Sequence, residues 1–161
     1  MSAALTRGAR VNADITALLK ARHTLLWVVT REERRVEAAL VEASATAKYM
    51  VRFWDCARGI TEVTDGKARV VVLEQDPGAA LEYVRGDKGR RVYVMRDLHK
   101  WLDPVVLRRL RNLARELQET EVKEQRTIVI LTPSAEVPPE LAGHATVIDH
   151  PLPDRAEVAA I

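Results

Sequence analysis

Apolar runs of strand length alternate along this chain with segments in which apolar residues recur every three or four positions. Most of the runs are continuous, which is typical of strands covered by helices on both faces. The predicted strands are 24–29, 49–54, 69–73, 92–95, 127–131 and 145–148. The clearest predicted helices are 31–47, 76–84 and 103–117. This order predicts one α/β domain over residues 1–161, a three-layer sandwich with a mainly parallel sheet.

Helix start signals refine the expected boundaries. Asp76-Pro77 and Asp103-Pro104 each combine a capping side chain with a proline that the first helical position tolerates. Near the N-terminus, Asn12 or Asp14 is the expected cap of a short helix. Residues 1–11 are therefore expected to form a flexible polar arm.

The order of elements is that of a P-loop-NTPase-like, Rossmann-like topology, but the chain lacks a phosphate loop. In such proteins the first buried strand leads into a glycine-rich turn whose backbone N–H groups surround the phosphates. Here no glycine occurs between Gly8 and Gly59. Thr30 and Glu33 instead fit a capping box, and the adjacent Glu32 and Glu33 would repel a triphosphate. No cofactor-binding site is expected in this segment.

Two positions retain the pattern of an ATPase site without its chemistry. Asp97 follows a buried strand, where a Walker B aspartate would hold magnesium, but the next residue is Leu98 rather than a catalytic glutamate. Thr132 follows the strongest strand, at the place of a polar sensor residue. One carboxylate without phosphates to bridge is a poor Mg²⁺ site. We interpret Asp97 and Thr132 as structural relics and expect neither a metal site nor catalytic residues.

Motifs spread over nearly the whole chain make the resemblance to a known family specific. They are, in order, Leu18-Leu19-Lys20-Ala21-Arg22, Thr30-Arg31-Glu32-Glu33-Arg34-Arg35, Phe53-Trp54, Gly59-Ile60, Met95-Arg96-Asp97-Leu98-His99, Leu102-Asp103-Pro104, Arg108-Arg109-Leu110-Arg111-Asn112-Leu113, Ile128-Val129-Ile130-Leu131-Thr132-Pro133-Ser134, Pro138-Pro139-Glu140-Leu141 and Pro151-Leu152-Pro153. The chain resembles the N-terminal region of the plastid and bacterial AAA-family ATPases known from a conserved plastid reading frame. The resemblance implies a degenerate, non-hydrolysing AAA-like domain followed by an active ATPase module, with ATP and Mg²⁺ as cofactors of that longer parent chain.

The charge distribution suggests an interaction surface. The net charge is only +2, yet residues 85–115 carry 10 basic and 3 acidic side chains, whereas residues 116–161 carry 3 basic and 9 acidic ones. The candidate interaction patch consists of Arg96, Arg108, Arg109, Arg111 and Arg115. Such a patch fits an acidic protein partner or nucleic acid, and a solvated helix face is the alternative. No aromatic residues interleave with the arginines to stack bases.

Composition excludes several other classes. A single cysteine, Cys56, excludes an intrachain disulfide framework, and the four histidines show no metal-binding spacing. No apolar run reaches membrane-spanning length, and the expected location is the cytoplasm. Residues 154–161 begin a helix that stops after about two turns, which fits either a missing ATPase module or a frayed end.

These observations leave two functions open. The first is a regulatory or assembly domain of an AAA-type ATPase, with protein partners and a homo-oligomeric ring formed through the parent. The alternative is a stand-alone nucleic-acid-binding module that uses the arginine-rich helix.

Overall fold

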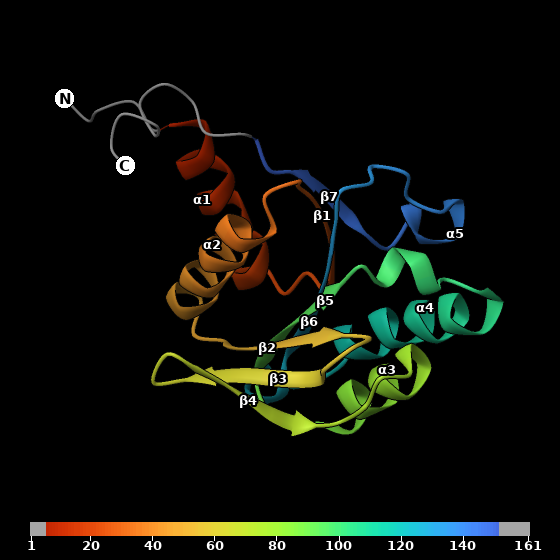
Figure 1. The fold of residues 1–161 in the computed structure, drawn as a ribbon. Coiled ribbons are helices and arrows are strands. Elements are labelled where there is room, and N and C mark those ends of the chain that lie inside the picture. Colours follow the sequence, from red (N-terminus) through yellow and green to blue (C-terminus); the bar gives the residue numbers. More distant parts are fainter. Residues whose placement is uncertain (1–5, 152–161) are drawn as a thin grey trace.

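The computed structural model describes residues 6–151 and shows one seven-stranded sheet with helices on both faces (Figure 1). The strands, in the spatial order β4-β3-β2-β5-β6-β1-β7, are β4 (Lys67–Val72), β3 (Gly59–Thr64), β2 (Met50–Asp55), β5 (Arg91–Arg96), β6 (Arg126–Thr132), β1 (Leu25–Val29) and β7 (Thr146–Asp149). From β2 to β7 all neighbours run parallel, and only the β2-β3 and β3-β4 pairs are antiparallel. The predicted α/β class and mainly parallel sheet are confirmed.

Helices divide between the two faces of the sheet. The α2 face is covered by α1 (Arg7–Lys20) and α2 (Glu33–Thr46), and the α4 face by α3 (Pro77–Gly86) and α4 (Pro104–Gln118). Three short helices, η1 (Leu98–Trp101), η2 (Val122–Glu124) and α5 (Pro139–Ala142), lie in the connections. Each face has its own apolar cluster, because successive side chains of a buried strand point to opposite faces. All seven residues of β6, which lies between β5 and β1, are buried.

The Asp-Pro helix starts are confirmed. Asp76 accepts a hydrogen bond from the Ala79 N–H at 2.8 Å, and Asp103 accepts one from the Val106 N–H at 2.8 Å. Each proline follows its cap at the start of its helix.

The prediction for the N-terminal arm is wrong from Arg7 onward. α1 begins there, capped by the Thr6 hydroxyl, which accepts from the Ala9 N–H at 3.0 Å. Neither Asn12 nor Asp14 caps it. Val11 and Ile15 already pack into the α2-face cluster, so this burial extends the helix beyond what the weak local signal indicates. The helix expected over 154–161 lies outside the described residues.

The strand β3 was not predicted, although it forms a hairpin with β4. The hairpin turns at Asp65 and Gly66, both with positive φ, as a two-residue turn between twisted strands requires. At its other end Gly59 has φ 78°, and a Cβ there would lie 2.6 Å from the Val72 carbonyl oxygen. The Asp-Gly pair was the available sequence signal, but the short, partly polar run before it hid the strand.

Candidate functional site

The carboxyl ends of the central strands bring the predicted relic positions together. The Thr30 N–H donates to the Thr132 carbonyl at 2.9 Å, and the Asp97 N–H donates to the Leu131 carbonyl at 3.0 Å. β1 lies between β6 and β7, so the chain leaves β1 toward β2 on one side and returns to β7 on the other. Ligands of open α/β sheets bind where strand order reverses in this way. This carboxyl edge is therefore the place at which a nucleotide site has to be tested.

The first strand-to-helix corner at this edge is closed by its own side chains, although not as a capping box. The Thr30 hydroxyl accepts from the Glu32 N–H at 2.9 Å, and α2 begins at Glu33 with no side-chain cap. Glu32 itself pairs with Arg35 at 2.6 Å. The predicted Thr30–Glu33 capping box is wrong, because the hydroxyl closes a tighter turn one residue earlier. No glycine-rich cradle is present at this corner.

Asp97 and Thr132 are both occupied with local backbone structure. Asp97 is exposed and left-handed, with φ 58°, and its carbonyl accepts from the Lys100 N–H at 3.0 Å. Thr132 is buried, and its hydroxyl accepts from the Ser134 N–H at 3.0 Å. Residues 6–151 contain no cluster of three histidine, cysteine or acidic side chains that could hold a metal ion. The Thr132 side chain and the Asp97 backbone thus shape turns at the edge.

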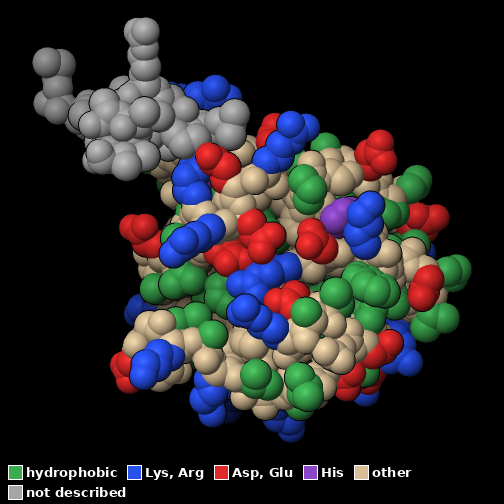
Figure 2. Space-filling view, viewed as in Figure 1, with side chains coloured by type: hydrophobic (Ala, Val, Ile, Leu, Met, Phe, Trp, Pro, Cys, Tyr) green, Lys and Arg blue, Asp and Glu red, His purple; other side chains and the backbone are tan. Residues whose placement is uncertain are grey.

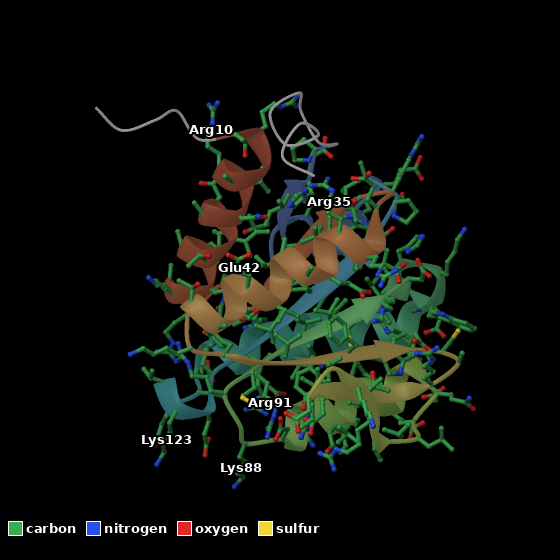
Figure 3. The ribbon with its side chains drawn as sticks, turned by 60° about the vertical axis from the view of Figure 1, so that its left-hand side comes forward. Arg10, Arg35, Glu42, Lys88, Arg91 and Lys123 are labelled. Atoms are coloured by element: carbon green, nitrogen blue, oxygen red, sulfur yellow. The ribbon has the colours of Figure 1, made fainter. Side chains whose placement is uncertain are left out.

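A cavity of about 770 Å³ at the same edge contains residues that the sequence analysis missed. Arg7 and Arg10 of α1 line it together with Arg31, which follows β1, and Asp149 is the acidic side chain among the described lining residues. Figure 3 shows Arg10 at this end of the molecule and Arg91 at the opposite end. The basic lining favours an anionic group held by side chains rather than by backbone amides. Sequence reasoning missed Arg7 and Arg10 because they were assigned to a flexible arm.

Arg96, the first member of the predicted patch, lies in an acidic pocket on the α2 face. Its guanidinium donates to Glu37 at 3.0 Å and to Asp55 at 3.2 Å, lies 3.5 Å from Glu33, and sits 4.6 Å above the Phe53 ring. Glu33 and Glu37 are four residues apart on α2 and therefore point to the same side. Burial and the neighbouring Glu37 carboxylate raise the pKa of Glu33, and Arg96 offsets part of this effect.

The other four members lie on α4, on the opposite face of the sheet. Arg108, Arg111 and Arg115 follow one stripe of the helix, which we call the arginine ridge, opposite the buried leucines. Arg109 points toward α3 and lies 3.4 Å from Glu82. The structure therefore does not join Arg96 to the α4 arginines, and the predicted five-residue patch is wrong in that respect. Figure 2 shows acidic and basic side chains interspersed on the face it presents.

Other cations of the basic segment are used inside the fold. Arg90 donates to the Lys48 carbonyl at 3.1 Å and to the Ala47 carbonyl at 3.2 Å, and thus satisfies the C-terminal end of α2. Arg91 donates to Asp87 at 2.6 Å. Arg90 and Arg91 are therefore engaged in contacts within the fold.

Comparison with known proteins places the fold in a family. The model of the SpoVK-like AAA ATPase N-terminal domain matches residues 11–150. The chain belongs to this family of N-terminal domains. Its similarity extends to the uncharacterized AAA domain-containing proteins ycf46 of Guillardia theta, 30% identical over 151 residues, and of Pyropia yezoensis, 28% identical over 149 residues.

The alignments cover most of this chain but a minor part of each relative. They include 90% of this chain in both cases, against 28% of the Guillardia theta protein and 29% of the Pyropia yezoensis protein. The resemblance stated from the motifs is confirmed at the level of an N-terminal AAA-family domain. Within residues 6–151, no helix has the length and apolar character needed to cross a bilayer.

Proposed function

We propose that this chain is a non-catalytic regulatory and assembly domain of an AAA-type ATPase. It contributes partner or substrate contacts and supports assembly of a ring, while a following module of the parent chain binds ATP and Mg²⁺ and hydrolyses the nucleotide. The proposed setting is the cytoplasm. The family match and the small share of the relatives' length that it covers support this division of labour.

The closed corner after β1 is the observation that carries the proposal. A phosphate cradle needs free backbone N–H groups at a helix start, with no acid beside them. Here the Thr30 hydroxyl occupies the Glu32 N–H, and Glu32 and Glu33 add two negative charges at the start of α2. The occupied backbone N–H and the two acids therefore both oppose a nucleotide held by backbone amides, as in a phosphate loop.

Nucleotide binding and hydrolysis by residues 1–161 test the proposal. Equilibrium dialysis with radiolabelled ATP and Mg²⁺, together with phosphate release, is expected to show neither micromolar binding nor turnover. Micromolar ATP binding, or hydrolysis, would overturn the proposal. The variant Arg10→Glu then shows whether the bound nucleotide lies in the cavity at the carboxyl edge.

A nucleic-acid-binding module is the second candidate, and the arginine ridge favours it. Arg108 and Arg115 are exposed, and neither has an ion pair within the described residues. A protein that neutralises several phosphates loses affinity steeply as salt rises. If the charge reversals Arg108→Glu and Arg111→Glu leave DNA and RNA binding unchanged, this candidate is excluded.

A further inference from the structure

The first turns of α3 and α4 enclose a cleft of about 560 Å³ on the α4 face. Trp101 and Val105, which line this Trp101 cleft, have 43% and 63% of their surfaces exposed. Large apolar side chains exposed side by side at a cleft are typical of protein interaction sites. The cleft is therefore a candidate anchor point for an apolar side chain of a partner.

The charged groups of the Trp101 cleft are already satisfied within the domain. Asp76 and Asp103 accept N–H groups at the starts of their own helices, where a carboxylate also balances the helix dipole. Glu82 lies 3.4 Å from Arg109 and 3.1 Å from Arg85. Covering the cleft would gain most at its apolar part, Trp101 and Val105, without a need for new partners for these carboxylates.

The arginine ridge begins beside this cleft and is not neutralised by described residues. Arg108 follows Val105 by three residues on α4, and Arg115 lies two turns further on, about 10 Å along the axis. No ion pair joins Arg108, Arg111 or Arg115 to a carboxylate between residues 6 and 151. An apolar anchor point is thus followed along one helix by a row of unneutralised cations.

We propose that the Trp101 cleft and the arginine ridge together bind an acidic amphipathic segment of a partner protein. An apolar side chain of that segment packs on Trp101 and Val105, and its carboxylates pair with the arginine ridge. This proposal names the partner contact of the proposed function and rests on it. Nucleic acid fits the surface less well, because its phosphates meet Asp76, Glu82 and Asp103 around the cleft.

The fluorescence of Trp101 can show whether the Trp101 cleft is occupied. Trp27 and Trp54 have no exposed surface, so Trp101 is the tryptophan that an aqueous quencher reaches first. The probe is a synthetic 18-residue helical peptide with leucines on one face and glutamates on the next, added to the full chain. Binding is expected to shift Trp101 emission to the blue and to protect it from iodide. A lysine-for-glutamate version of the peptide is expected to leave the emission unchanged.

Variants separate the two halves of the surface. The double variant Arg108→Glu/Arg115→Glu is expected to weaken peptide binding about tenfold or more, and Val105→Asp about fivefold or more. Arg34→Glu, on a helix of the other face, is the matched control and keeps the affinity. All these positions are exposed, and circular dichroism checks that each variant is folded.

Three results overturn the proposal. They are no emission change up to millimolar peptide, equal binding by the double variant, and nucleic-acid binding that needs the ridge but ignores Val105→Asp. The ATP test is independent of these results. Failure of peptide binding in a chain without ATP turnover leaves the proposed function intact, whereas ATP turnover overturns that function whatever the peptide does.

Discussion

Arg96 and the arginine ridge belong to the same basic segment, yet Arg96 is paired with acids inside the fold and the ridge is paired with no acid among the described residues. Arg96 ends β5 on the α2 face, where Glu33, Glu37 and Asp55 surround its guanidinium. The ridge lies on α4 across the sheet, with Arg108 and Arg115 exposed, Arg111 half-buried and the leucines of the helix inward. Some arginines of this basic segment are therefore paired with acids inside the fold, and others remain exposed on its surface.

The position of each arginine in its strand or helix determines whether it is paired inside the fold or exposed. On β5, Val92, Val94 and Arg96 alternate with residues of the α4-face cluster, so Arg96 must point toward α2. There α2 presents acids four residues apart. Twelve residues further along, the helical period of α4 turns Val106, Leu110, Leu113 and Leu117 inward and leaves Arg108 and Arg115 outside.

The largest effect is expected from removing the Arg96 guanidinium. Arg96→Met keeps the apolar stem but leaves three carboxylates crowded around an empty position. We expect a loss of about 2–4 kcal/mol in the free energy of unfolding, because the largely buried Glu37 and Asp55 lose their cation, while the half-exposed Glu33 adds less. Urea denaturation followed by circular dichroism measures it. Arg108→Met is the matched control, and an equal loss in both variants would remove the distinction between the two regions.

The sequence predicts features that depend on neighbouring residues, but not contacts between residues far apart in the chain. The helix starts at Asp76 and Asp103, the buried strands and the missing phosphate loop are local features, and the sequence shows each of them. The partners of Arg96 are not local in the sequence. Glu37 lies 59 positions away and contacts Arg96 only because the fold packs α2 against the end of β5. The same limit explains the missed roles of Arg7 and Arg10. Burial against distant elements, rather than local propensity, makes that segment a helix.

A second internal network, at the opposite end of β5, is expected to show the next largest effect. The Tyr93 hydroxyl donates to Asp87 at 2.6 Å and accepts from Arg52 at 3.2 Å, so it links the two charges. Tyr93→Phe removes both bonds and leaves Asp87 and Arg52 less well satisfied. We expect a loss of about 1–3 kcal/mol, measured by thermal or urea unfolding. An unchanged stability would mean that Arg52 and Asp87 pair well without the hydroxyl.

The same network predicts that the free energy of unfolding falls at low pH. Burial raises the pKa of Asp87, but hydrogen bonds from Tyr93 and Arg91 outweigh it, so the pKa lies below its ordinary value. A group with a depressed pKa in the folded state stabilises the fold above its unfolded pKa, about 3.9 for aspartate. That contribution is lost as the pH falls through the lower folded pKa. Asp87→Asn is expected to flatten the decline in unfolding free energy below about pH 4. If the decline is the same in this variant, other carboxylates cause it.

The smallest effect is expected on the arginine ridge itself. Arg108→Ala and Arg115→Ala, alone or together, remove exposed cations that pair with no described acid, while alanine is a better helix former than arginine. We expect the free energy of unfolding to change by less than about 0.5 kcal/mol. Urea denaturation at low and high salt measures the change. A loss above about 1 kcal/mol would show that the ridge stabilises the fold in the way Arg96 does. The proposal that its cations are unpaired and bind a partner would then be contradicted.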